Sequence, residues 1–525
     1  MAFTFQINDD VVFNHDERLL AKAEANRPVL KQRVIQPTRL VDIIADEAGL
    51  NGYLAVDNQQ EVARLTDYPQ GRDGSLVLDF GDHQVGHFSI DIDSVGSPMD
   101  APLYLRLKFA EIPAEIAADS ADYDGWLSKA WIQEEYIHLD TLPAHLELPR
   151  RYSFRYVELK VVDTSPKWQA AFSHPQVTVE SAVEIAEAPT VALADAQLQK
   201  IYDISVKTLQ DCMQTVFEDG PKRDRRLWIG DLRLQALANY ATFDQRELVK
   251  RCLYLFGGMT TTDGKIPANV FTAPKLTPDD TFLFDYSLFF VSILADYQAH
   301  TNDRVVLADL YGIAKQQVQV AAQKVDAQGA LRLDDAWPVF VDWSNDFNKE
   351  TAGQAILIYT LKQFITLAHL MNDADVSEYE ALLAKMTTYA KETLFDPQQQ
   401  LFVSGEAREI NVASQVWMVL AHVLDDAQNT LVMQKMVAEL FPITGIATPY
   451  MYHHVVEALF EAGQTETAVQ LMKDYWGKMV DLGADTFWEA FKPEDPDFSP
   501  YGSPIISSYC HAWSCTPAYL IQKYL

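Results

Sequence analysis

The sequence predicts a mixed, multidomain fold in which an N-terminal antiparallel β-sandwich precedes an (α/α)6 toroid or barrel. With 525 residues the chain is longer than one hydrophobic core usually allows, so two domains are expected. Hydrophobic residues alternate with period two in the first part of the chain and recur with period 3.6 in the rest. The connections between the predicted helices are alternately long and short. We therefore assign residues 1–190 to the sandwich and residues 191–525 to the barrel.

The predicted sandwich consists of short strands between about residues 75 and 186. Glycine, proline and aspartate separate these strands and no helical segment comes between them, which is typical of an antiparallel sandwich. Residues 1–74 are mixed and show no clear period. The motif GDHQVGH, with His83 and His87, indicates a turn rather than a metal site. The strand segments are SLVLDFGDHQVGHFSIDID, PLYLRLKFAEI, EEYIHLD, RRYSFRYVELKVVD and QVTVESAVEI.

The predicted barrel contains about twelve helices between residue 195 and Leu525. In an up-and-down array alternate connections lie at opposite ends, so six long loops would gather at one end of six hairpins that close into a toroid. Long loops in compact domains are uncommon and usually functional. The helices are expected at 197–216, 231–241, 244–257, 283–299, 302–325, 351–373, 376–393, 411–425, 427–439, 450–463, 465–481 and 508–524. The long loops are 217–230, 258–282, 326–350, 394–410, 440–449 and 482–507.

Composition and charge limit the partners of the protein. The net charge of −32 argues against nucleic acids and anionic membranes, because both would repel such a surface. The first residues lack a secretory signal and no apolar run is long enough to span a bilayer. The four cysteines show neither metal-ligand nor disulfide-framework spacing. These features predict a cytoplasmic protein with reduced thiols.

The first long loop contains DGPKRDRRLWIGD, residues 219–231, in which seven of thirteen side chains are charged. Crowded carboxylates raise one another's pKa, while neighbouring arginines lower it. A general acid that works near neutral pH requires the first effect, with burial, to prevail for one carboxyl group. The sequence leaves open which of Asp219, Asp224 and Asp231 is protonated.

The other long loops also combine carboxylates with aromatic rings. Carboxylates accept hydrogen bonds from sugar hydroxyls and aromatic faces stack on pyranose rings, so a concave site with both is typical of a carbohydrate pocket. For any single acid the simpler interpretation is a solvated loop residue; the gathering of the whole set on one rim favours a sugar site. The acids are Asp279, Asp280, Asp285, Asp334, Asp335, Asp342, Asp346, Asp485 and Glu489, and the aromatics are Trp228, Phe282, Phe284, Trp337, Trp343, Trp488 and Trp513.

Glycoside hydrolysis requires two carboxyl groups beside the scissile bond, one protonated and one ionised. The last long loop, GADTFWEAFKPEDPDFSPYG, places Glu489 next to Trp488. The first and last hairpins of a closed ring are neighbours, although they are far apart in the sequence. We therefore expect the first loop to supply a proton donor opposite a base on the last hairpin.

At these two motifs the sequence resembles the bacterial α-L-rhamnosidases of glycoside hydrolase family 78. The family's first motif is roughly D-C-P-x-R-[DE]-E-R-x-G-W-T-G-D and here reads DGPKRDRRLWIGD. Its last motif, roughly G-A-T-T-x-W-E followed by a histidine in the final helix, here reads GADTFWE and SYCHAWS. The segments LDFGDHQVGHFSIDI, LRLKFAEI and RRYSFRYVELKV also resemble the β-domain of that family. The resemblance covers about residues 75–525.

The resemblance implies single-displacement hydrolysis with inversion and a role for several residues. Asp224 would be the general acid and Glu489 the base that activates water. The family's acid is usually glutamate, so the shorter Asp224 requires the loop backbone to lie closer to the sugar. The methyl group of rhamnose would meet an aromatic patch, for which Phe282, Phe284 and Trp337 are candidates. The other expected pocket residues are Asp219, Arg223, Trp228, Asp231, Asp285, Trp343, Trp488 and His511.

Together these features predict an intracellular α-L-rhamnosidase that acts on small rhamnosides such as rhamno-disaccharides and flavonoid glycosides. No cofactor and no metal are implied, and the resemblance suggests a homodimer. Two alternatives stay open at this point. One is another (α/α)6 glycosidase or phosphorylase, specific for glucuronyl or glucosyl groups; the other is a sugar-binding protein with a degenerate site.

Overall fold

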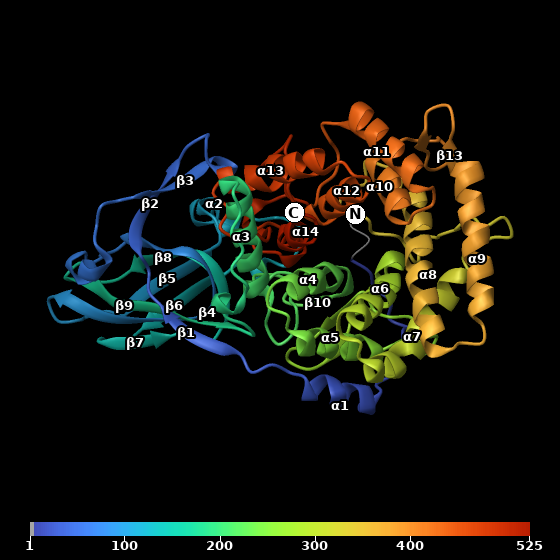
Figure 1. Ribbon diagram of the computed structural model, residues 1–525. Coiled ribbons are helices and arrows are strands. Elements are labelled where there is room, and N and C mark those ends of the chain that lie inside the picture. Colours follow the sequence, from blue (N-terminus) through green and yellow to red (C-terminus); the bar gives the residue numbers. More distant parts are fainter. Residues whose placement is uncertain (1–4) are drawn as a thin grey trace.

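The computed structural model describes residues 5–525 and places a β-sheet domain beside a helical domain (Figure 1). The strands of the sheet domain pair antiparallel, as the period-two pattern predicts. Their bounds are β1 Lys31–Ile35, β2 Arg39–Ala45, β3 Tyr53–Asp57, β4 Ser75–Gly96, β5 Leu103–Ala110, β6 Glu134–Leu139, β7 Ala144–Glu147, β8 Tyr152–Asp163 and β9 Trp168–Ser181.

The long strand β4 connects two parts of this sheet. Its first half pairs with β2 and β8, and its second half pairs with β9 and β7, so the sheet folds over one hydrophobic core. The register shifts between Asp79 and Gln84, where Gly81 has a positive φ of 90°. The turn expected at GDHQVGH is therefore wrong, because the chain continues through a bulge in one strand. His83 lies within this bulge and is fully buried.

The helical domain contains twelve main helices between residues 196 and 524 of the described chain, as the 3.6-residue period predicts. The helices α4, α6, α8, α10, α12 and α14 pack against one another in that order, and α14 returns to α4, which closes a ring. The helices α3, α5, α7, α9, α11 and α13 pack outside it. Their bounds are α3 Ala196–Cys212, α4 Ile229–Ala241, α5 Arg246–Gly258, α6 Phe284–Thr301, α7 Arg304–Ala322, α8 Glu350–Met371, α9 Val376–Tyr389, α10 Val412–Leu420, α11 Asp426–Leu440, α12 Pro449–Glu461, α13 Thr465–Asp481 and α14 Pro517–Tyr524.

The two sets of helices differ in burial for a simple geometric reason. Inner helices such as α6 and α8 contact neighbours on all sides and are apolar almost all round, whereas outer helices such as α9 bury one face. Every long loop leads from an outer helix to the next inner one, so the long loops and the N-termini of the inner helices share one end of the ring. This arrangement confirms the (α/α)6 architecture that the loop lengths predict.

The last helix is shorter than expected. It begins at Pro517, a residue type that is favoured in the first turn of a helix, and the preceding residues form loop and 3-10 turns. The expected helix at 508–524 is therefore wrong in its first half. As a consequence, His511 lies in the last long loop instead of on a helix.

A short helix precedes the sheet domain and packs on the barrel. This helix, α1 (Glu17–Ala25), lies against α5 and buries Leu19 and Ala23 there (Figure 1). In the described residues no helix has the length and apolar character needed to cross a membrane.

Candidate active site

A cavity of about 250 Å³ opens at the long-loop end of the barrel. Its wall is formed by the first and last long loops, the beginnings of α4 and α6, the loop before α8, and a segment of the sheet domain. Eight of the residues expected at the site line this cavity. They are Asp219, Arg223, Asp224, Trp228, Asp231, Trp343, Glu489 and His511.

Arg223 connects the two carboxyl groups expected to be catalytic. Its Nη2 lies 2.5 Å from Oε2 of Glu489, and its Nη1 lies 3.3 Å from Oδ1 of Asp224. The guanidinium is itself held by a bond from Nε to the Ile506 carbonyl oxygen (3.0 Å) and by the ring of Tyr501, whose centroid is 4.1 Å away. The motifs far apart in the sequence therefore meet at one buried cation.

Glu489 is fixed by several contacts within the last loop. Its backbone N–H donates to the Ser508 carbonyl (3.1 Å), and its own carbonyl accepts from Nε1 of Trp513 (2.9 Å). The Tyr501 hydroxyl donates a short hydrogen bond to its Oε1. Burial raises the pKa of Glu489, while the charge of Arg223 and the Tyr501 hydrogen bond oppose this rise. Arg223 and Tyr501 thus favour the ionised form that a general base requires.

Asp219 organises the backbone of the first loop. Its two carboxyl oxygens accept from the backbone N–H groups of Asp224 and Arg226, each at 3.0 Å. Its carbonyl accepts from the N–H of Ala512 (3.0 Å), which joins the first loop to the last. Burial and the nearby charge of Asp224 raise the pKa of Asp219 to about 7. Asp219 is therefore a support for Asp224 as well as a wall residue.

Asp231 and His511 face each other at the bottom of the cavity. Asp231 lies in the first turn of α4, and its Oδ1 is 3.6 Å from Nδ1 of His511, which exceeds hydrogen-bond distance. Within residues 5–525 neither atom has a hydrogen-bond partner. Burial, with the charge of Asp219, raises the pKa of Asp231 well above its usual range, and burial with the charge of Arg223 lowers the pKa of His511. Both groups are thus available to the hydroxyls of a neutral ligand.

Four expected pocket residues are not among the residues that line this cavity and lie behind its wall. Asp285, in the first turn of α6, accepts from the backbone N–H groups of Phe340 and Val341, both at 3.0 Å. Phe284 and Trp337 pack edge-on against each other with ring centroids 5.0 Å apart. Trp488 packs on Phe491 and Tyr509. These side chains pack behind the wall and support it.

Several residues of the wall were not expected from the sequence. Tyr286, Phe340 and Tyr501 line the cavity together with Trp513, in place of the aromatic patch expected from Phe282, Phe284 and Trp337. Tyr286 follows Asp285 directly in the sequence. Phe340 belongs to the same FVDW segment as Trp343. A third contribution comes from the sheet domain, in which Trp126, Leu127, Ser128 and Trp131 reach the cavity. This segment has no alternating pattern that would have distinguished it from other loops.

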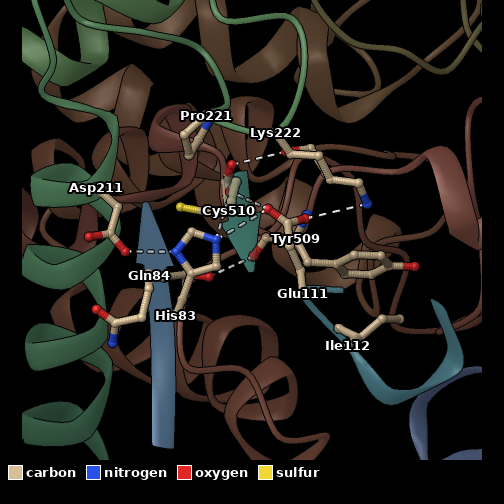
Figure 2. Close-up of polar contacts among 12 residues, drawn as sticks. His83, Gln84, Glu111, Ile112, Asp211, Pro221, Lys222, Tyr509 and Cys510 are labelled. Atoms are coloured by element: carbon tan, nitrogen blue, oxygen red, sulfur yellow. Dashed lines mark hydrogen bonds and ion pairs between the residues drawn. The ribbon is translucent and has the colours of Figure 1, made fainter. Parts of the chain in front are cut away.

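A buried polar network ties the sheet domain to the loops of the site (Figure 2). Lys222, two residues before Asp224, donates to Oε2 of Glu115 and to the Ser507 carbonyl, both at 2.7 Å. Glu111 accepts from the backbone N–H of Tyr509 (2.7 Å). Both carboxylates come from the end of β5 and the adjoining helix α2 (Pro113–Ala117). The sheet domain therefore holds both of the loops that carry the expected catalytic pair.

The same network continues to His83 on the bulge of β4 (Figure 2). Its Nδ1 is 2.7 Å from Asp211, and its Nε2 is 3.2 Å from Glu111 and 2.9 Å from Ser153. Ligand atoms of His83, Asp211 and Cys510 lie within 4.8 Å of one another, a spacing that could hold a metal ion. Both ring nitrogens of His83 instead make hydrogen bonds to oxygen atoms, so His83 belongs to a cluster of hydrogen-bonded charged groups. Burial alone would lower the pKa of His83, but Cys510 and the hydrogen bonds to Asp211 and Glu111 outweigh burial and raise it.

Comparison with known families gives a consistent result. Residues 37–179 match the glycosyl hydrolase family 78 alpha-rhamnosidase N-terminal domain, and residues 186–525 match the bacterial alpha-L-rhamnosidase 6 hairpin glycosidase domain. A curated alpha-L-rhamnosidase of Streptomyces avermitilis is 24% identical over 486 residues, which cover 88% of this chain. The match spans 43% of the length of that relative.

Solved structures show the same relationship. A rhamnosidase from Klebsiella oxytoca with rhamnose bound is 44% identical, with a TM-score of 0.95 that covers 98% of this chain and 100% of that one. A family 78 rhamnosidase from Bacillus sp. GL1 is 20% identical, with a TM-score of 0.72 over 87% of this chain and 47% of that one. The latter similarity concerns the fold alone.

Proposed function

Because the chain belongs to the bacterial α-L-rhamnosidases of glycoside hydrolase family 78, we propose that it hydrolyses the bond between a terminal, non-reducing α-L-rhamnose and its leaving group. The observation that carries this proposal is the meeting of Asp224 and Glu489 in one cavity, where Arg223 contacts both. Two carboxyl groups beside one bond are what glycoside hydrolysis requires.

In the proposed mechanism Asp224 is the general acid. Its side chain is 16% exposed, more than that of Glu489 at 6%, so it faces the outer part of the cavity. It would donate its proton to the glycosidic oxygen as the bond to the anomeric carbon breaks. The Asp219 carboxylate accepts hydrogen bonds from the backbone N–H groups of residues 224 and 226. These bonds hold the loop in the position that Asp224, which is shorter than the usual glutamate, needs to reach the glycosidic oxygen.

Glu489 is proposed as the base that activates water on the opposite face of the sugar. Contacts with Arg223 and Tyr501 favour its ionised form, and the Asp231 and His511 atoms that have no hydrogen-bond partner within residues 5–525 are suited to bind sugar hydroxyls. As Glu489 gains a proton and Asp224 loses one, the negative charge passes from one carboxyl group to the other, and Arg223 contacts both. Attack by water in a single displacement would invert the anomeric configuration.

The first prediction concerns the two carboxyl groups. We expect Glu489→Gln to lower kcat for 4-nitrophenyl α-L-rhamnopyranoside by roughly 10²–10⁴-fold, the usual contribution of general acid–base catalysis. Asp224→Asn should lower kcat by a similar factor for a rhamno-disaccharide, whose alcohol leaving group must be protonated. The loss in Asp224→Asn should shrink as the leaving group becomes more acidic, because such a group departs without a proton. The loss in Glu489→Gln should not depend on the leaving group.

Four outcomes would contradict this assignment. If kcat fell by the same factor in both variants for every leaving group of a series, Asp224 and Glu489 would not have separate acid and base roles. Retention of configuration, observed by proton NMR of the first-formed rhamnose, would remove the single displacement. Wild-type protein that binds rhamnose without turnover would indicate a sugar-binding protein, and preference for a glucuronide or glucoside in a nitrophenyl glycoside panel would indicate another barrel glycosidase.

The proposed substrates are small rhamnosides, including rhamno-disaccharides and flavonoid glycosides. A cavity of about 250 Å³ is at the lower end of the range for small-molecule sites and suits one sugar ring with an adjoining group. A homodimer and a cytoplasmic location are further predictions; the four buried free thiols agree with a reducing compartment. Light scattering coupled to size-exclusion chromatography tests the first, and fractionation of the source cells tests the second.

A further inference from the structure

The mouth of the cavity carries an aromatic rim that comes from the sheet domain. The segment 126–131 contributes Trp126, Leu127 and Trp131 to the cavity wall, and Trp126 is 49% exposed. Its ring lies 5.6 Å from the ring of Tyr501 and 6.2 Å from that of Phe5. An exposed tryptophan beside a concave site is a typical sign of a ligand surface, because its large apolar face is left in contact with water.

Buried neighbours of Trp126 hold the segment in place. The hydroxyl of Tyr123 donates to the Leu127 carbonyl at 3.1 Å. Leu127 and Trp131 pack against a small core that includes Tyr501 and Ile506 of the last long loop. The rim is therefore a fixed surface, and about half of the Trp126 side chain stays exposed.

The cavity has two regions, a buried bottom and a more exposed mouth. The bottom is formed by Asp231, His511, Tyr286 and Trp513, each at most 3% exposed. The mouth contains Trp126 together with the partly exposed Asp224, whose side chain is 16% exposed. A terminal sugar that is cleaved from the end of its glycoside enters first and occupies the bottom. The leaving group must then lie at the mouth, beside the acid that protonates its oxygen.

We propose that Trp126, with Leu127 and Trp131, binds the leaving group of the substrate and that this surface selects flat, apolar aglycones such as aryl groups. The inference rests on the proposed function, since it assumes that the bottom of the cavity holds rhamnose. A flat aromatic leaving group can stack on an indole ring, whereas a small alkyl group covers little of it.

The test compares two leaving groups in one variant. In Trp126→Ala we expect kcat/KM for 4-nitrophenyl α-L-rhamnopyranoside to fall about tenfold, which corresponds to ~1.4 kcal/mol of stacking. For the trifluoroethyl α-L-rhamnopyranoside the change should stay within about twofold. The inhibition constant of free L-rhamnose, which occupies only the bottom, should not change. Trp126→Phe should recover most of the loss, and Tyr136→Ala, an equally exposed aromatic on β6, should show none.

The possible failures are distinguishable. Wild-type protein that cleaves neither rhamnoside would overturn the proposed function itself. Active protein in which Trp126→Ala loses the same factor for both leaving groups, or nothing for either, would overturn the aglycone surface alone. Conversion of a dimer to a monomer by Trp126→Ala, with equal losses for both substrates, would assign the rim to a second copy of the chain and would also overturn the inference.

Discussion

At the scale of single residues, Arg223 links the two carboxyl groups that are proposed to be catalytic. Its side chain is 3% exposed and contacts Glu489, Asp224 and the ring of Tyr501. Burial alone would lower the pKa of this guanidinium, but the surrounding carboxylates outweigh burial and raise it. A permanent positive charge at this point favours the ionised form of Glu489, with which Arg223 forms an ion pair.

The pH dependence of activity should report this effect. Burial raises the pKa of Glu489, and the charge of Arg223 opposes the rise. The proposed base must be ionised, so activity is lost as the pH falls through its pKa. We expect Arg223→Gln to raise that pKa further and to move the acid limb of kcat/KM to higher pH.

A matched substitution separates charge from geometry in this experiment. Arg223→Lys keeps the positive charge but loses the fork of N–H donors, so it should restore the position of the acid limb without restoring the rate. An acid limb that stays at the same pH in Arg223→Gln would show that Glu489 does not titrate in this limb or that Arg223 does not influence it.

At the scale of structural elements, buried aspartates connect helix starts to loops. Asp285 in the first turn of α6 holds the backbone of Phe340 and Val341. Asp342, in the same loop, accepts from the N–H of Ala447 (3.0 Å) and from the hydroxyl of Thr448 (2.5 Å) at the start of α12. Burial raises the pKa of both aspartates, and these hydrogen bonds oppose the rise. The aromatic wall of Phe340 and Trp343 thus depends on contacts with two inner helices.

Substitution of Asp285 should make the wall segment of Phe340 and Trp343 less firmly held, although Asp285 does not itself line the cavity. Asp285→Ala leaves two buried N–H groups without an acceptor, at a cost of about 1–3 kcal/mol each. We expect a lower Tm in calorimetry and a higher KM for aryl rhamnosides, with a smaller change in kcat. The control is Asp334→Ala, in the loop before α8, which removes a carboxylate that is 54% exposed. This variant should change neither Tm nor KM appreciably. An unchanged Tm in Asp285→Ala would contradict the supporting role.

At the scale of the whole molecule, the sheet domain and the barrel share one buried polar network. Lys222 of the first loop contacts Glu115 of the sheet domain and Ser507 of the last loop, and its side chain is only 1% exposed. Burial, with the charge of Glu111, raises the pKa of Glu115 to about 7. Such a network fixes the orientation of the two domains because any shift would leave a buried charge unpaired.

Breaking this network should reduce stability and activity together. Lys222→Met removes one partner of a buried pair, which costs on the order of 3–5 kcal/mol. We expect a lower Tm, a single unfolding transition in the wild type, and a fall in kcat, because Lys222 is two residues from Asp224. The control is Arg72→Met, which breaks a pair with Asp163 in which both side chains are 58% exposed and should cost at most about 1 kcal/mol. A Lys222→Met variant with wild-type kcat would show that the network does not position the loop.

The sequence alone determined the architecture and the two motifs of the site. Periods of two and 3.6 separate the sheet from the helices, and the alternation of long and short loops predicts the ring and the end at which its loops gather. The same reasoning predicts that Asp224 and Glu489 share a cavity, since first and last hairpins of a ring are neighbours. These inferences succeed because repeating burial leaves a repeating pattern in the sequence.

Only the tertiary structure decided which loop side chains face the cavity. Phe284, Trp337 and Trp488 point behind the wall, whereas Tyr501 and Trp126 reach it. The direction of a side chain in an irregular loop depends on partners that are distant in sequence, such as the sheet domain that holds Lys222 through Glu115. No local period records those partners, so the aromatic lining of the cavity and the contribution of the sheet domain to it became visible only when both domains were packed together.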